Sequence, residues 1–318
     1  GKGKVVKFIG HFHGWHDYAM IGVNPPYDRP STAGIPEATQ KTTVVIPAND
    51  AAKLEQTLAN DNDIACVIIE PSGASWGTIP VFPSFLKELR EVTKRHKVLL
   101  IFDEVVTGFR YSTGGVQKLY NILPDVTTLA KIVAGGLPGG AVVGRTDIMK
   151  YMEYRDPQWN VRSRVAHQGT FNANPLTAAA GVAALKIVKT GEPHGIANGM
   201  ASLLRKGLNE QLEKHGVEGC VYGDVSCFHV YVGPCAKRGD CDRGLCVNDP
   251  EALKGTPPAV RNAIVRAMLT QGAFLFGMGG TVSMAHTQQD IEKSVAAFGR
   301  ALELCQRELA SVSAPLPR

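Results

Sequence analysis

The segment 98–110, Val-Leu-Leu-Ile-Phe-Asp-Glu-Val-Val-Thr-Gly-Phe-Arg, constrains the fold more than any other stretch of the chain. Its first five residues are all apolar, a pattern typical of a strand buried on both faces of a parallel sheet. Two carboxylates, Asp103 and Glu104, follow at once. Because ligands of open α/β sheets bind outside the carboxyl ends of the strands, the pattern predicts a counter-charge for a cationic group or a metal ligand at this place.

A lysine in a glycine-rich turn follows this strand. Lys131 precedes the sequence Ile-Val-Ala-Gly-Gly-Leu-Pro-Gly-Gly, and glycines allow the backbone to approach a bound group closely. A buried acid together with a lysine in a tight turn is the pair that an aldehyde cofactor with a pyridine nitrogen requires. The two segments therefore predict a cofactor site.

Three segments carry a family resemblance. Residues 102–110, 124–131 and 169–176 resemble the class III pyridoxal-phosphate aminotransferases, nearest to the branch that holds glutamate-1-semialdehyde aminomutase and the β-amino-acid transaminases. The resemblance covers nearly the whole chain in the family's order. It implies the α/β fold of aspartate aminotransferase (fold type I), with a mostly parallel sheet flanked by helices and a smaller α+β C-terminal domain.

The resemblance also implies roles for residues of the strand and the turn. Lys131 would bind the aldehyde of pyridoxal 5'-phosphate as a Schiff base and then act as base and acid. Asp103 would pair with the protonated pyridine nitrogen and keep the ring an electron sink. Val105 would pack against the ring face, although core packing explains a valine equally well.

Two further segments would complete the cofactor site. Phe12, His13 and Gly14 match an aromatic-His-Gly motif in which the aromatic ring stacks on the cofactor. Thr170 resembles the threonine that reaches the cofactor phosphate of the neighbouring subunit. This implies a homodimer with shared active sites.

Two other interpretations of these motifs remain open. The segment 11–17 contains three histidines and an aspartate, which suggests a metal, but no helical or finger-like ligand spacing supports one. An apolar strand that ends in Asp-Glu is also typical of P-loop ATPases, but the segment Gly1-Lys2-Gly3-Lys4 is not a phosphate-binding loop. We therefore predict no metal and favour pyridoxal phosphate.

The predicted substrate class depends on one position at which this sequence differs from the aminomutase pattern. The aminomutase places a glutamate before a Ser-x-Ala-His stretch, which is 283–286 here, and Met278 stands at that position. This favours an aminotransferase that moves an amino group between an amino acid, including a β-amino acid, and a 2-oxo acid. The aminomutase is the alternative, and racemases and decarboxylases share the same motifs. Candidate ligands of a substrate carboxylate are Arg29, Arg162 and Arg164.

Length and composition indicate a globular protein and argue against nucleic-acid-binding, membrane-spanning and secreted disulfide-rich proteins. The chain has 318 residues, 44% of them hydrophobic and 20% charged, with a net charge of +5. This length predicts two domains, a large cofactor-binding domain over 1–190 and a connecting helix with a small domain over 191–318. No basic block with interleaved aromatics predicts a nucleic-acid partner, and no apolar run predicts a membrane span. Seven irregularly spaced cysteines argue against a secreted disulfide framework, so we expect a cytoplasmic enzyme.

The chain opens directly on an expected strand over 4–9. Members of the resembled family carry a segment before this point that holds the cofactor phosphate. This predicts an N-terminally truncated homologue. The alternative of another class is a non-catalytic chain that acts as a subunit or interaction partner.

Local patterns predict the elements around the site. We expect strands over 43–46, 65–69, 139–144 and 273–276, strand structure within 221–232, and helices over 176–188, 195–214 and 258–270. Expected helix caps are Asp50, Ser84 and the pair Thr287–Asp290. Cys235, Cys241 and Cys246 fall in a polar segment without Cys-x-x-Cys spacing, which favours a surface insertion with incidental thiols over a zinc site.

Overall fold

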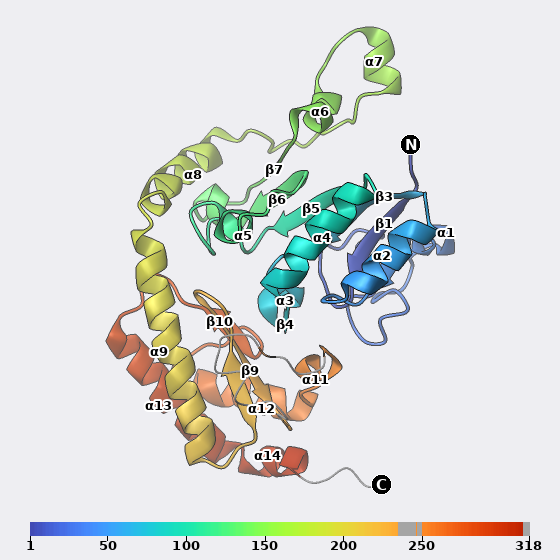
Figure 1. Ribbon diagram of the computed structural model, residues 1–318. Helices are drawn as coiled ribbons and strands as arrows, with labels where there is room; N and C mark the ends of the chain where they lie inside the picture. The colour runs from blue at the N-terminus through green and yellow to red at the C-terminus, as the bar shows by residue number, and fades with distance from the viewer. Residues whose placement is uncertain (235–245, 247–249, 314–318) are drawn as a thin grey trace. The chain divides into compact units, whose positions relative to one another are not determined.

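A computed structural model describes residues 1–234, 246 and 250–313 of the chain (Figure 1). The chain divides into two compact units. The first unit comprises Gly1–Ala74 and Val81–Thr190, and the second comprises Ser75–Pro80 and Gly191–Arg318. Of the three cysteines predicted in a surface insertion, Cys235 and Cys241 lie outside the described residues, whereas the surface position expected for Cys246 is wrong, because Cys246 is buried.

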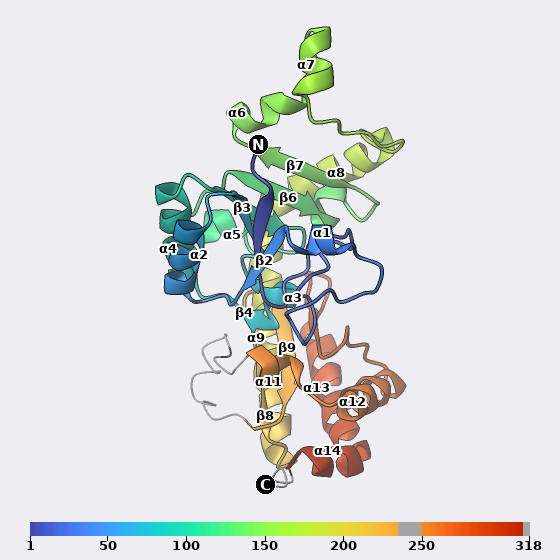
Figure 2. The same cartoon turned by 90° about the vertical axis from the view of Figure 1, so that its right-hand side faces the viewer.

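A six-stranded sheet forms the centre of the first unit (Figure 2). Its strands are β1 (Lys4–Phe8), β2 (Thr43–Ile46), β3 (Ile64–Ile69), β5 (Leu99–Glu104), β6 (Val126–Ala130) and β7 (Gly140–Gly144), in the order β2-β1-β3-β5-β6-β7. All neighbouring strands are parallel except β6 and β7. This is the mostly parallel sheet that the sequence predicts.

Strand β5 lies inside this sheet. Its neighbours are β3, with Ile69 opposite Phe102, and β6, with Thr128 opposite Asp103. Leu100 and Phe102 are fully buried. The unbroken apolar run is explained by this position, because a central parallel strand is covered on both faces.

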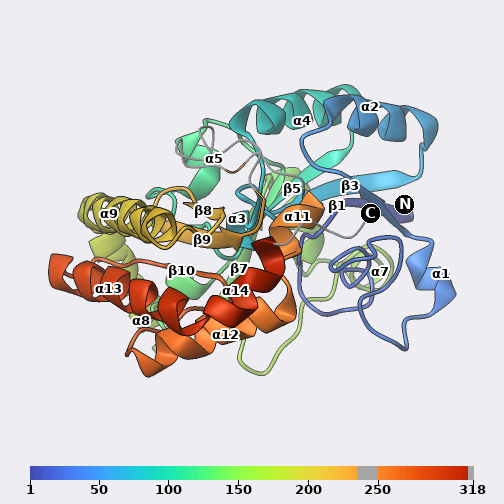
Figure 3. The same cartoon turned by 90° about the horizontal axis from the view of Figure 1, so that it is seen from below.

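Helices α2 (Ala51–Asn60) and α4 (Pro83–Arg95) pack beside one another in the first unit (Figure 3). The predicted cap of α2 is confirmed, since the Asp50 carboxylate accepts a hydrogen bond from Lys53 N at 2.8 Å. The predicted cap of α4 is wrong. Phe82 occupies the N-cap without a side-chain hydrogen bond and Pro83 takes the first helical position, where its fixed φ and missing N–H fit best. Ser84 therefore lies inside the helix.

The remaining helices of the first unit are short, apart from α8. They are α1 (Glu37–Gln40), α5 (Gly115–Leu119), η1 (Lys131–Ala134), α6 (Thr146–Met149), η2 (Lys150–Met152), α7 (Pro157–Arg162) and α8 (Pro175–Val188). Helix α8 begins at Pro175, one residue before the predicted start, and of its residues only Gly181 is buried. A Cβ on Gly181 would collide with the carbonyl of Val133, so α8 meets η1 through backbone rather than through apolar side chains.

The second unit contains a three-stranded antiparallel sheet in the order β10-β9-β8. Its strands are β8 (Gly219–Tyr222), β9 (Cys227–Val232) and β10 (Gly279–Thr281), and its helices are α9 (Glu192–Lys214), α11 (Pro250–Lys254), α12 (Pro258–Thr270), α13 (Gln288–Leu304) and α14 (Gln306–Ser313). The segment Ser75–Pro80 of this unit contains β4 (Ile79–Pro80) and most of the turn α3 (Ala74–Gly77). Side chains of α9, α12 and α13 form one apolar cluster with β8 and β9.

Two predictions for the second unit have opposite outcomes. The capping box of α13 is confirmed, because Asp290 N donates to the Thr287 hydroxyl while Thr287 N donates to the Asp290 carboxylate. The strand expected over 273–276 is wrong. Phe276 N donates to Gly279 O across a turn, and the ladder with β9 begins only at Gly279.

No helix in the described part of the chain is long and apolar enough to cross a membrane.

Candidate active site

The carboxylate of Asp103 lies at the carboxyl end of β5 and is 8% exposed. Its Oδ2 atom lies 2.7 Å from His13 Nδ1. Its Oδ1 atom accepts hydrogen bonds from Val105 N at 3.1 Å and from the Thr128 hydroxyl at 3.3 Å. A carboxylate in its ionised form only accepts hydrogen bonds, and with that form His13 Nδ1 is the donor of this hydrogen bond. The other nitrogen of this ring, Nε2, is buried and has no hydrogen-bond partner among the described residues.

The loop after β1 brings His13 to this carboxylate. Phe12 N donates to the Glu70 carboxylate at 2.8 Å, and Glu70 N donates to His11 Nδ1 at 3.0 Å. These two hydrogen bonds tie the loop to the end of β3. The ring of Phe12 stays 48% exposed, so an apolar face is available for contact beside the buried acid. Gly14 follows with a φ of +94°.

Lys131 is the first residue of η1 and adopts a left-handed φ of +53°. Non-glycine residues in this region are strained and cluster at functional sites. Partial desolvation of the ammonium lowers the pKa of Lys131, while the negative charges of Asp103 and Glu70 act in the opposite direction. Arg110 adds to the lowering. Lys131 thus shares one electrostatic environment with Asp103.

Glu104, the second carboxylate of the pair, has a different environment. It is fully buried and accepts hydrogen bonds from Thr107, from Val116 N, and from both the backbone and the side-chain amide of Gln117. A Cβ on Gly115 would collide with this carboxylate. Burial nevertheless raises the pKa of Glu104, and these hydrogen bonds act against the rise. Glu104 is the anchor of α5.

The predicted site residues separate into two groups. The structure brings His13, Asp103 and Val105 into direct contact and places Lys131 within their electrostatic reach. Thr170 lies on an exposed loop, and no hydrogen bond among the described residues joins it to Asp103 or Lys131.

Thr128 and Glu70 are polar contacts of the site that the sequence analysis missed. The signal for Thr128 is its position three residues before Lys131, within the segment 124–131 that carries the family resemblance. Glu70 ends a predicted strand in the same way that Asp103 does, and this was its signal. Glu70 could have been found by comparing the residues that follow the predicted strands.

The candidate arginines have separate surroundings. Arg29 pairs with its neighbour Asp28 at 3.0 Å. The guanidinium of Arg164 lies 3.9 Å from the centre of the Tyr154 ring. Arg162 is exposed at the end of α7.

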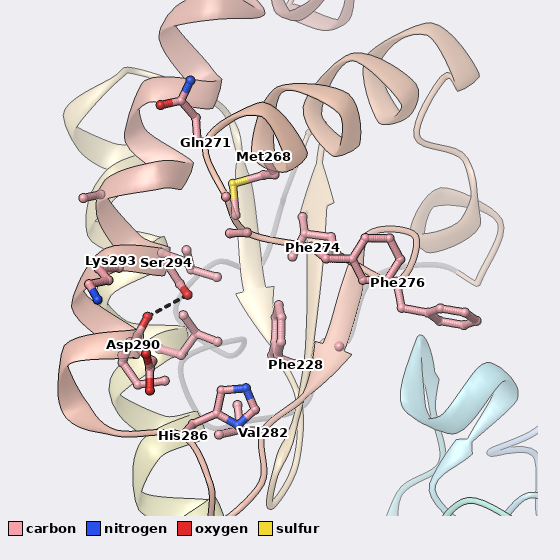
Figure 4. Close-up of a pocket in the computed structure, with 18 of the residues that line it drawn as sticks. Phe228, Met268, Gln271, Phe274, Phe276, Val282, His286, Asp290, Lys293 and Ser294 are labelled. Atoms are coloured by element: carbon pink, nitrogen blue, oxygen red, sulfur yellow. Dashed lines mark hydrogen bonds between the residues drawn. The ribbon is translucent and has the colours of Figure 1, made fainter.

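A pocket of about 970 Å³ lies in the second unit (Figure 4). Phe228, Phe274 and Met268 contribute apolar lining, and His286 and Asp290 contribute polar groups. In this pocket the Ser294 hydroxyl donates to the Asp290 carbonyl at 2.8 Å. None of the predicted cofactor-binding residues lines it. In the described residues, no cluster of three or more histidine, cysteine or acidic side chains could hold a metal ion.

The donor set in the first unit suits an aromatic aldehyde with a basic ring nitrogen. Asp103 contacts His13, Val105 N and the Thr128 hydroxyl, and a buried carboxylate is favourable when a cation compensates it. A protonated ring nitrogen would supply that cation. The exposed ring of Phe12 offers a stacking surface, and a lysine of lowered pKa offers an amine that reacts with aldehydes.

Comparisons with known proteins agree with this chemistry. The model of the class III aminotransferase family matches residues 1–223. Glutamate-1-semialdehyde 2,1-aminomutase of Pyrobaculum aerophilum is 36% identical over 312 residues, which cover 96% of this chain and 70% of that protein.

Two solved structures are similar throughout the chain. An omega-transaminase from Sphaerobacter thermophilus has a TM-score of 0.81 at 31% identity, covering 96% of this chain and 69% of that one. A beta-phenylalanine aminotransferase from Variovorax paradoxus has a TM-score of 0.74 at 29% identity, covering 96% and 65%. The predicted family, fold type and cofactor are thereby confirmed. The chain belongs to the class III aminotransferase family and is a pyridoxal-phosphate-dependent enzyme.

Proposed function

We propose that this enzyme transfers an amino group from an amino acid, with β-amino acids among the candidate donors, to a 2-oxo acid. The observation that carries the proposal is the pairing of Lys131, whose pKa is lowered, with the buried carboxylate of Asp103 in one electrostatic environment. Transfer requires a group that moves a proton and a group that holds one, and these two side chains can supply both.

In this proposal Asp103 would pair with the ring nitrogen of pyridoxal phosphate and keep it protonated, and His13, Val105 N and Thr128 orient the Asp103 carboxylate. The bound cofactor supplies an electron sink for the substrate carbon. Phe12 and Val105 would pack against the cofactor ring, and Gly14 would allow close approach of the backbone.

Lys131 has two roles in the proposal. Its Nζ atom would hold the cofactor aldehyde, and the same atom would move a proton at the substrate carbon. The lowered pKa of Lys131 serves both roles, because a larger share of the amine is neutral near pH 8 than in an ordinary lysine.

The choice of transamination rests on Met278. The resembled aminomutases carry a glutamate at this position, whereas Met278 packs against the apolar cluster of the second unit, with its backbone carbonyl accepting from Val230 N at 2.6 Å. An apolar side chain supplies no charge here. Both similar solved structures are named as transaminases or aminotransferases, and one of them is named for a β-amino acid.

The assembly is part of the same proposal. Thr170 would reach the cofactor phosphate of a second copy, which makes the active enzyme a homodimer with shared sites. Its exposure on a loop suits a contact made between chains. We place the enzyme in the cytoplasm, on the evidence of its irregularly spaced cysteines.

The test follows the amino group. The protein is mixed with pyridoxal phosphate, 2-oxoglutarate and one ¹⁵N-labelled amino acid at a time, including β-amino acids, and labelled glutamate is measured by mass spectrometry. Labelled glutamate, absent in Lys131→Ala, supports transfer. A racemised or decarboxylated donor without transferred label contradicts it.

Glutamate-1-semialdehyde aminomutase is the second candidate. It is favoured by the 36% identity to the Pyrobaculum aerophilum enzyme of that name. The two candidates differ in their need for an acceptor. Consumption of glutamate 1-semialdehyde without any added 2-oxo acid, combined with no labelled glutamate in the first assay, would establish the aminomutase instead.

A further inference from the structure

Two buried thiols meet in the second unit. The Sγ atoms of Cys220 and Cys246 lie 3.7 Å apart, and the two residues are 2% and 1% exposed. Sulfur atoms in a disulfide are about 2.05 Å apart. The two thiols are therefore in contact, and a bond between them requires an approach of roughly 1.7 Å, which side-chain rotation and small backbone shifts can supply.

The pleat of β8 directs the thiol of Cys220 toward Cys246. Successive side chains of a strand point to opposite faces. Val221 lies in the apolar cluster formed with α9, α12 and α13, whereas Cys220 and Tyr222 lie in a separate cluster. That separate cluster also contains Tyr231, Cys246 and Leu253. Cys246 therefore packs against the face of the sheet that Cys220 presents.

The strand register excludes Cys227 as a partner of Cys220. Cys220 is opposite Tyr231 in the ladder, and Cys227 lies four residues along β9, a displacement of about 13 Å. Disulfide Cα atoms are at most about 7 Å apart. Cys305 belongs to the cluster on the other face of the sheet, and Cys66 lies in β3 of the first unit.

We propose that Cys220 and Cys246 form a disulfide when the enzyme meets a peroxide. One thiolate attacks a peroxide oxygen, the O–O bond breaks, and after proton transfer a sulfenic acid and water result. The second thiol attacks the sulfenic sulfur, the S–S bond forms, and the hydroxyl leaves as water. In total, two thiols are oxidised and one hydrogen peroxide is reduced to two waters.

The disulfide would stabilise the fold. The two cysteines are 26 residues apart in the sequence, so the bond closes a long loop in the unfolded chain and lowers its entropy. An increase in Tm of at least roughly 5 °C is expected for oxidised over reduced protein. Reduction by dithiothreitol should reverse it.

The experiment maps the bond in the full chain. Protein is treated with hydrogen peroxide, remaining thiols are blocked with N-ethylmaleimide, and a non-reducing digest is analysed by mass spectrometry. The expected product is one linked pair of peptides containing Cys220 and Cys246, which dithiothreitol separates. Cys246→Ser should abolish both the pair and the Tm increase, whereas the matched variant Cys227→Ser, also at a buried cysteine of this sheet, should retain both.

Two results would overturn the proposal. One is Cys220 recovered as the maleimide adduct after peroxide treatment that oxidises other cysteines of the chain. The other is Cys220 linked to Cys235 or Cys241 in place of Cys246. Both are read from the unsubstituted protein, so the outcome does not depend on whether Cys246→Ser folds. Because no cofactor is needed, failure here leaves the proposed transamination untouched.

Discussion

His13 and Asp103 are 90 residues apart in the sequence, yet Nδ1 of the first lies 2.7 Å from Oδ2 of the second. Both side chains are less than one tenth exposed. They meet because only β3 separates β1 from β5 in the sheet, and the carboxyl ends of these parallel strands share one edge. The imidazole thus orients a carboxylate that is largely buried.

Replacement of His13 by alanine should weaken binding of pyridoxal phosphate by about 10-fold or more. The expected size follows from the loss of a hydrogen bond to a charged group, about 1.5–3 kcal/mol. The dissociation constant can be measured from the cofactor's absorbance. His16→Ala is the matched control, because His16 is exposed on the same loop, and it should bind within about twofold of the parent. Equal affinities of the two variants would contradict a role for His13.

Lys131 should be the lysine that borohydride reduction links to pyridoxal phosphate. Its pKa is lowered, so the neutral amine accumulates at lower pH than in an ordinary lysine. We expect trapped label at Lys131 to rise with pH and to reach half its maximum below the ordinary lysine value of about 10.4. Peptide mapping should find no label at this site in Lys131→Ala and unchanged label in Lys150→Ala. Label distributed evenly over surface lysines would argue against the assignment.

Asp125 should be critical for stability. It accepts hydrogen bonds from Arg90, Arg145 and Leu100 N, each at 2.8 Å. Asp125→Ala leaves Arg90 in a buried site without its counter-charge and should lower the free energy of unfolding by about 3–5 kcal/mol. Urea titration measures this. Glu55→Ala, which removes a half-exposed partner of Arg95 and His96, should cost less than about 1 kcal/mol.

The same carboxylate predicts a dependence of stability on pH. Burial alone would raise the pKa of Asp125, but hydrogen bonds from Arg90, Leu100 N and Arg145 outweigh it and the pKa is lowered. The stabilisation is therefore complete above the unfolded value of about 3.9 and is lost as the pH falls through the lower folded value. Below about pH 4, the urea midpoint of Asp125→Asn should fall less steeply than that of the parent.

Alanine substitution should have different effects on stability at the two predicted cap positions, Thr287 and Ser84. Thr287→Ala breaks the capping box of α13 and should cost about 1 kcal/mol. Ser84→Ala should change stability by less than about 0.5 kcal/mol, because Ser84 is exposed inside α4 and caps nothing. Thermal unfolding of both variants against the parent measures the difference. A larger loss for Ser84→Ala would reverse our assignment of the α4 terminus.

Features determined by neighbouring residues were predictable from the sequence. Thr287 and Asp290 satisfy one another within a single turn, and Asp50 bonds the amide three residues ahead. The apolar run of β5 and the acid at its end also carry their own signal. In the site, Asp103 and Lys131 could be named because a strand end and a glycine-rich turn are local patterns.

Features determined by distant partners were not predictable. The residues 273–276 alternate in burial, with Phe274 and Phe276 exposed around Leu275, yet a strand also needs a partner, and the ladder with β9 starts at Gly279. Likewise Thr128 contacts Asp103 only because β5 and β6 pair in one register. The roles of Thr170 and of the candidate arginines remain predictions, since each depends on a molecule that the chain alone does not contain.

Asp103 and Glu104 are adjacent, but the pleat of β5 sends one carboxylate toward the lysine and the other into the start of α5. The chain therefore has no tolerance for an indel in this strand. Loss or gain of a single residue would interchange the two acids, placing the charge that serves chemistry where an anchor is needed and the anchor where chemistry occurs. Point substitutions can tune either acid separately, so this strand can evolve by exchange of side chains but not by change of length.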